Sequence, residues 1–145
     1  MSTTAFAAIQ AALLAAIMAS PALASGNISV NRQRPIASGQ SCAIVLRMDH
    51  AAGTEMVIGA LDWQTTFIVE CYATGAAGSD PSSAVDALLS DTWARLSALS
   101  FESLGASISL DPHIEWQYDD VAVPIVCAVI RLTAQHRTTT LVLQP

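Results

Sequence analysis

The chain has 145 residues and a net charge of −6 at pH 7, from six arginines, no lysine and twelve acidic residues. Its length predicts one domain over residues 1–145. The acidic balance excludes a basic field that would attract a nucleic-acid backbone, so we expect no sequence-specific binding of DNA or RNA. Only 12% of the residues are charged, and such a charge-poor surface is typical of a subunit that is covered by neighbours. Beyond the N-terminus, no apolar run reaches the roughly 18 residues that a membrane span needs, so no membrane partner is expected.

The first predicted element is an alanine-rich helix over residues 1–22. Serine and threonine at positions 2–4 can cap its N-terminus, and Pro21 and Gly26 are stop signals. Large apolar residues recur at three- and four-residue spacing, which is typical of a packed helix face. This stripe consists of Phe6, Ile9, Leu13 and Ile17.

A secretory signal peptide is the competing interpretation of the same region. Ala22-Leu23-Ala24 has the small-x-small pattern of a cleavage site. A signal peptide also needs a basic start, and the first basic residue of this chain is Arg32. We therefore favour the packed helix and expect a protein that is not secreted.

Strand patterns follow the helix. A short piece, Ile28 to Val30, precedes a polar loop, and residues 41–49 alternate between an apolar face and a second face that ends in Arg47 and Asp49. A turn is expected at residues 50–55. Residues 62–73 alternate in the same way, which predicts a sheet with one covered face.

The second half of the chain predicts one helix and three strands. Asp80 or Ser79 can cap a helix that starts with Pro81 and runs to about residue 99. Strands are expected at 106–110, 113–118 and 123–137, the last bent or placed at an edge near Pro124, followed by a C-terminal arm at 138–145. The fold class expected is α+β: a two-layer sandwich with a mainly antiparallel mixed sheet and both helices packed on one face.

Residues suited to chemistry are few. Asp111, His113 and Glu115 alternate as they would on one face of a strand and could hold a divalent ion. A solvated polar edge explains them without a metal, and we favour that interpretation because nothing elsewhere completes a metal-binding signature. The three cysteines lie in apolar strand-like runs without CxxC spacing, which indicates buried free thiols in a reducing compartment. They are Cys42, Cys71 and Cys127. No phosphate loop, nucleophile elbow or HExxH motif is present, so we expect no catalytic residue, metal or cofactor.

Several segments together resemble the tail terminator proteins of long-tailed phages and prophages, the minor tail protein U type. They are an N-terminal helix, "NRQRPI" leading to "AIVLRMD", "LDWQTTFIVECYA" running into "DPSSAVDALLSDTWARL", and "IEWQYDD" before a long strand ending "AQHRT". The similarity covers about residues 4–138. It lies in the order of the elements and in the residues of their loops, and it includes no catalytic motif.

The resemblance implies a non-enzymatic virion protein that forms a homohexameric ring at the head-proximal end of the tail tube. Such a ring stops tube polymerisation, contacts the tail tube protein and the head–tail connector, and leaves room for DNA to pass. The protein would be assembled in the host cytoplasm. Charged residues of the polar loop and of the predicted strands are the candidate protein–protein contacts: Arg32, Arg34, Arg47, Asp49, Arg131 and Arg137.

Three alternatives remain open at this point. The nearest is another head–tail joining or neck component with a similar small build. The second is a small cytoplasmic enzyme that uses Asp111, His113 and Glu115 with a metal ion. The third is a secreted periplasmic binding protein, which requires cleavage after Ala24.

Overall fold

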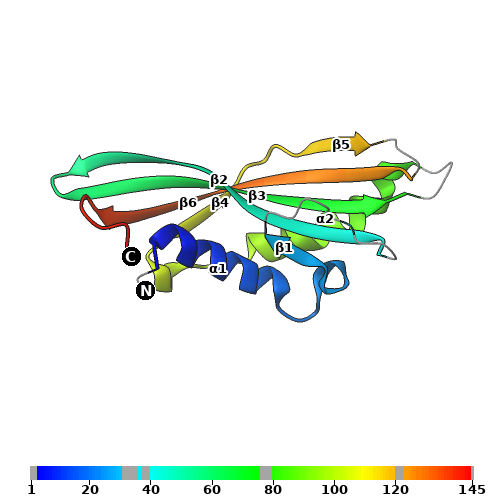
Figure 1. Ribbon diagram of the computed structural model, residues 1–145, viewed down its shortest axis with the longest axis horizontal. Coiled ribbons are helices and arrows are strands. Elements are labelled where there is room, and N and C mark those ends of the chain that lie inside the picture. The colour runs from blue at the N-terminus through cyan, green and yellow to red at the C-terminus, as the bar shows by residue number, and fades with distance from the viewer. Residues whose placement is uncertain (1–2, 31–35, 37–39, 76–79, 120–122, 145) are drawn as a thin grey trace.

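Within the described residues, a six-stranded mixed sheet forms one layer and two α-helices form the other (Figure 1). The computed structural model describes residues 3–30, 36, 40–75, 80–119 and 123–144. The strands are β1 (Ile28–Val30), β2 (Cys42–Val57), β3 (Ala60–Thr74), β4 (Ser107–Leu110), β5 (Glu115–Asp119) and β6 (Ile125–Thr139). The helices are α1 (Ala5–Met18) and α2 (Pro81–Ser97), with short 3-10 turns η1 (Leu23–Gly26) and η2 (Glu102–Leu104). The predicted order of helices and strands is confirmed.

The three long strands form the antiparallel centre of the sheet. The strand order is β1-β2-β3-β6-β4. β4 and β5 both pair with the outer side of β6: β5 pairs with its first half, and β4 pairs with its second half. β1 adds to β2 in parallel. The predicted edge position near Pro124 is wrong, because β6 starts one residue later and is an inner strand; the chain bends at Val123, just before the proline. A proline just before a strand costs the sheet no hydrogen bond, because its missing N–H lies outside the ladder.

The β2–β3 hairpin is longer than the sequence indicates. Residues 50–55, expected to be a turn, continue β2, and the chain reverses only at Ile58 and Gly59. Gly59 has φ +83°, a conformation that favours glycine. A register shift between Met48 and His50 changes which residues face the helices. This bulge interrupts the alternation, and pairing with β3 overrides the weak strand propensity of residues 50–55.

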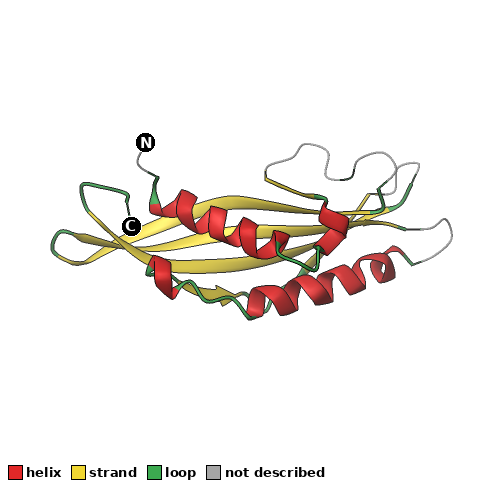
Figure 2. Ribbon diagram, turned by 90° about the horizontal axis from the view of Figure 1, so that it is seen from below, coloured by secondary structure: helices red, strands yellow, loops and turns green. Residues whose placement is uncertain are grey.

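Both helices cover the same face of the sheet, as Figures 1 and 2 show, which confirms the predicted sandwich. In α1, Thr4 accepts a hydrogen bond from the Ala7 amide as N-cap. The helix ends at Met18 and not at residue 22, because a residue that precedes a proline disfavours the helical conformation and Pro21 follows closely. The buried stripe matches the prediction except that Ala5 takes the place of Phe6, which is half-buried: Ala5, Ile9, Leu13 and Ile17.

Helix α2 begins as predicted and is tied to the end of α1. Asp80 accepts from the Ser82 amide as N-cap, with Pro81 at the first helical position. Arg95 donates to the carbonyls of Ile17, Ala19 and Pro21 at 2.7–2.9 Å. A guanidinium there satisfies acceptors that the end of α1 leaves free and complements its negative pole.

The core lies between the helices and the sheet. Its centre is Phe67, with Leu13 of α1, Leu46 of β2 and Ile130 of β6, all at most 1% exposed. A smaller cluster of Ile68, Cys127 and Val129 is buried on the opposite face. That face, expected to be polar, therefore carries a small buried apolar cluster, and Arg47 and Arg131 flank its Ile68 in the sheet register.

Candidate interaction surface

We call residues 49–62 of the β2–β3 hairpin the arm; its tip extends beyond the start of α1 (Figure 1). Every residue from Asp49 to Gly59 is exposed. At the tip, Met56 is 73% exposed, Val57 53% and Ile58 98%. Adjacent apolar side chains with such exposure are uncommon on a monomer and mark interaction sites.

The C-terminal segment, residues 140–144, joins the tip of the arm to the start of α1. The amide of Thr140 donates to the Gly59 carbonyl (3.1 Å), and the Leu143 carbonyl accepts from the Ala5 amide (2.7 Å). Leu141 is 93% exposed. An exposed arm or a short added strand was predicted at residues 138–145; β6 instead continues to Thr139, with Thr138 buried, and residues 140–144 are exposed. The exposed apolar side chains at this end of the molecule thus come from two distant parts of the sequence, and we call them together the arm end: Met56, Val57, Ile58, Leu141, Val142 and Leu143.

An aromatic cluster supports the base of the arm. The indole Nε1 of Trp63 donates to Thr138 Oγ1 at 2.9 Å. Phe6 of α1 packs edge-on against Trp63 with ring centroids 5.1 Å apart. A Cβ at Gly53 would lie 2.9 Å from the Trp63 ring, so this glycine gives the indole room. The sequence offered no signal for this role of Gly53, because its partner is on another strand.

A second exposed apolar surface lies on β5, away from the arm (Figure 1). Trp116 and Tyr118 pair with Ala128 and Val126 and so share one face of the strand. They are 45% and 54% exposed, and Val123, just before β6, is 52% exposed. We call these three residues the β5 surface. Most of the large exposed apolar side chains of the described residues therefore lie at two separate places, and Met18 and Val30 lie outside both.

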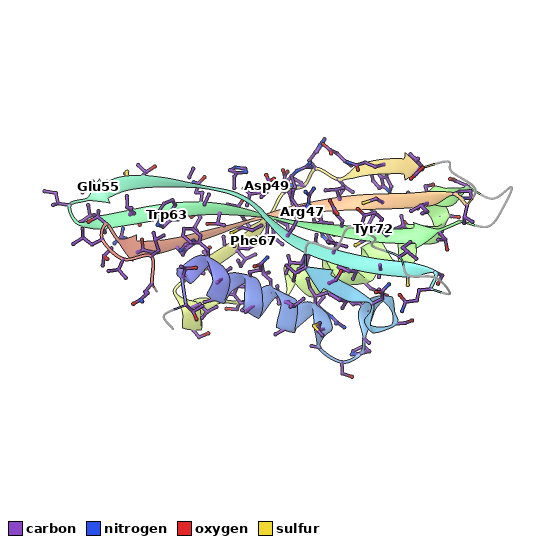
Figure 3. The ribbon with its side chains drawn as sticks, in the orientation of Figure 1. Arg47, Asp49, Glu55, Trp63, Phe67 and Tyr72 are labelled. Carbon is purple, nitrogen blue, oxygen red and sulfur yellow. The ribbon has the colours of Figure 1, made fainter. Side chains whose placement is uncertain are left out.

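The predicted contact arginines are engaged within the chain where the structure describes them. Arg47 pairs with Glu70 at 2.8 Å and Arg131 with Glu115 at 3.1 Å. Both arginines flank Ile68 in the sheet register, so the structure brings these two together; Figure 3 shows Arg47 near the centre of the sheet.

The other predicted contacts lie apart from that pair. Arg137 pairs with Asp62 through two hydrogen bonds of 2.6 and 3.0 Å on the arm side, and its guanidinium lowers the pKa of Asp62. Asp49 contacts the neighbouring His50 at 2.8 Å. Exposed ion pairs of this kind contribute little to stability. Arg32 and Arg34 lie outside the described residues.

The proposed metal ligands do not share one strand. β5 begins only at Glu115, so the expected alternation along an extended face is wrong. Glu115 contacts Arg131, whose guanidinium lowers the pKa of this carboxyl, and also His113 at 3.4 Å. Asp111 accepts from the His113 amide. Within the described residues, no group of three potential metal-binding side chains could hold an ion.

The cysteines are free thiols. Burial raises the pKa of Cys71 to about 12, partly offset by a hydrogen bond with Thr92. Burial also raises the pKa of Cys127 to about 12. Because the thiolate is the reactive form, both thiols are unreactive at neutral pH. Cys42 differs from the prediction in being only half-buried.

A scan against protein-family models gives no match, and a search of curated proteins gives no significant match. In the part of the chain that the structure describes, no helix is both long and apolar enough to cross a membrane.

Proposed function

We propose that this protein is a tail terminator of a long-tailed phage or prophage, a non-enzymatic ring subunit at the head-proximal end of the tail tube. In this role, the ring would stop polymerisation of the tail tube protein and would form the docking surface for the head connector. Its proposed location is the virion tail, assembled in the host cytoplasm.

The observation that carries this proposal is the separation of the two exposed apolar surfaces. The arm end includes Ile58 at 98% and Leu141 at 93% exposure, and the β5 surface includes Trp116 at 45%. A subunit with two different surfaces can make heterologous contacts, in which one surface of each copy meets the other surface of the next. Such contacts close into rings when the rotation between neighbours permits it.

The charge pattern is compatible with the same role. Interface cores are depleted in charged residues; residues 56–61 and 140–144 contain none, and the adjoining Glu55 accepts a hydrogen bond from the Gly59 amide at 3.2 Å. The net charge of −6 would also avoid tight binding to DNA that passes through a ring.

Images of phage particles that lack this protein test the proposal. We expect overlong tails without heads, because an unterminated tube continues to polymerise. Restoring the wild-type chain should restore tails of normal length. Headless tails of normal length would instead identify a head–tail joining component, and complete infectious particles would refute both functions.

A further inference from the structure

His136 is a buried titratable side chain that the proposed function does not use. It lies on β6, 6% exposed, opposite Trp63 in the register with β3. Its Nε2 is 3.0 Å from Thr65 Oγ1, and Thr65 is fully buried. Its Nδ1 is buried and has no hydrogen-bond partner within the described part of the chain. A neutral imidazole can leave this nitrogen without a proton, whereas an imidazolium would bury an unpaired N–H and a charge.

The first turn of α1 packs against this imidazole. Phe6 meets the His136 ring edge-on, with centroids 5.1 Å apart and an interplanar angle of 82°. The same phenyl ring packs on Trp63, and the neighbouring Ala5 amide binds the Leu143 carbonyl. His136 therefore lies where the helix start, the C-terminal segment and the base of the arm meet.

Among the described residues, the two carboxylates that line the same pocket as His136 are those of Asp62 and Glu102, and neither compensates an imidazolium. α1 and the C-terminal segment contain no charged residue. Next to His136 and its partner Trp63, Arg137 and Asp62 pair with each other. Because side chains alternate along a strand, these two project from the face of the sheet opposite to that of His136. Glu102 of η2 is exposed. The positive pole of α1 lies at its first turn and further disfavours an imidazolium, and burial lowers the pKa of His136.

We propose that His136 is a proton-sensitive latch, in which the neutral imidazole holds the first turn of α1 on the sheet and the imidazolium releases it. Release would free Phe6 and the Leu143 contact together, because both are made by that turn. The apolar arm end would then gain freedom at mildly acidic pH. This inference stands on the packing around His136 and does not depend on the phage function.

The sign of the pH effect follows from the lowered pKa. Above the ordinary histidine pKa of about 6.5, the imidazole is neutral in the closed and open states, and the latch is fully stable. Below that value the open state binds the proton more readily. Closure therefore weakens as pH falls, by at most about tenfold per pH unit, until the pKa of the closed state is reached.

Hydrogen exchange read by mass spectrometry tests the latch on the full chain. Protection factors of the first turn of α1, corrected for the intrinsic pH dependence of exchange, are compared at about pH 7.5 and about pH 5.5. We expect a several-fold loss of protection at the lower pH in the wild type and no such loss in His136→Gln. The matched control His50→Gln removes an exposed histidine and should behave like the wild type.

Imidazole titration by NMR keeps the proposal testable if His136→Gln does not fold. In the wild-type chain, we expect the resonances of His136 to titrate below the ordinary histidine pKa of about 6.5, because burial lowers the pKa of this imidazole. If the first turn of α1 loses protection at acidic pH in His136→Gln as it does in the wild type, the latch is overturned. Titration of His136 at or above about 6.5, the ordinary histidine pKa, would overturn it as well.

Discussion

The two halves of strand β2 have opposite surroundings. From Ala43 to Leu46 the side chains are at most 3% exposed, whereas Met56 to Ile58 at the far end of the hairpin are 53–98% exposed. The first half lies in the helix-covered sheet, and the second belongs to the arm. Since one strand runs through both, the difference is not a matter of secondary structure. It shows that the chain completes its core within one subunit and leaves the arm end for contacts outside it.

The largest expected effect compares a leucine of the core with a leucine beside the arm tip. Leu13 is 0% exposed in α1 and Leu141 is 93% exposed beside the arm tip. We expect Leu13→Ala to lower the free energy of unfolding by about 2–5 kcal/mol, because it removes buried methyl groups and leaves a cavity. Leu141→Ala should change it by less than about 0.5 kcal/mol. Urea denaturation of both variants measures the difference, and equal losses would mean that the C-terminal segment belongs to the core.

A smaller effect is expected where the two helices are tied together. Arg95→Met removes three hydrogen bonds to the carbonyls of Ile17, Ala19 and Pro21 and should lower the free energy of unfolding by about 2 kcal/mol. Arg47→Met removes one ion pair with Glu70, whose arginine is 46% exposed, and should cost less than Arg95→Met. The comparison fails if both arginine variants unfold at the same urea concentration.

The smallest expected effect concerns the base of the arm. Gly53→Ala places a methyl group 2.9 Å from the Trp63 ring, so the indole must shift away from Phe6 and Thr138. We expect a loss of about 1 kcal/mol in the free energy of unfolding, as for mild overpacking. The control Ala52→Ser changes the neighbouring exposed position and should leave stability unchanged. If Gly53→Ala leaves the free energy of unfolding unchanged, the aromatic cluster accommodates the methyl group without a loss of stability.

The sequence predicted the layers because periodicity and end signals are local. The spacing of Ile9, Leu13 and Ile17 indicated the buried face of α1, and Asp80 with Pro81 indicated the start of α2. The alternation of residues 62–73 indicated the covered face of β3. The order of the elements and the two-layer sandwich followed from these local signals.

The arm and the contacts at its base could not be predicted, because they depend on pairing between distant strands. Residues 50–55 have a turn-like composition, and only their pairing with β3 makes them strand. The role of Gly53 requires Trp63, and that of His136 requires Phe6. The arginines were predicted as contacts from their charge alone, which does not reveal partners such as Glu70 and Glu115 within the same chain.

The molecular mass of the assembly tests the central claim most directly, namely that the arm end is left for other copies. Light scattering on the wild-type chain, alone and with tail tubes, should give a mass near six copies of the 15.2 kDa chain. Met56→Gln combined with Ile58→Gln should lower that mass. Met18→Gln, which changes an exposed methionine on α1 away from both apolar surfaces, should keep it. A wild-type monomer at high concentration and in the presence of tubes would contradict the account.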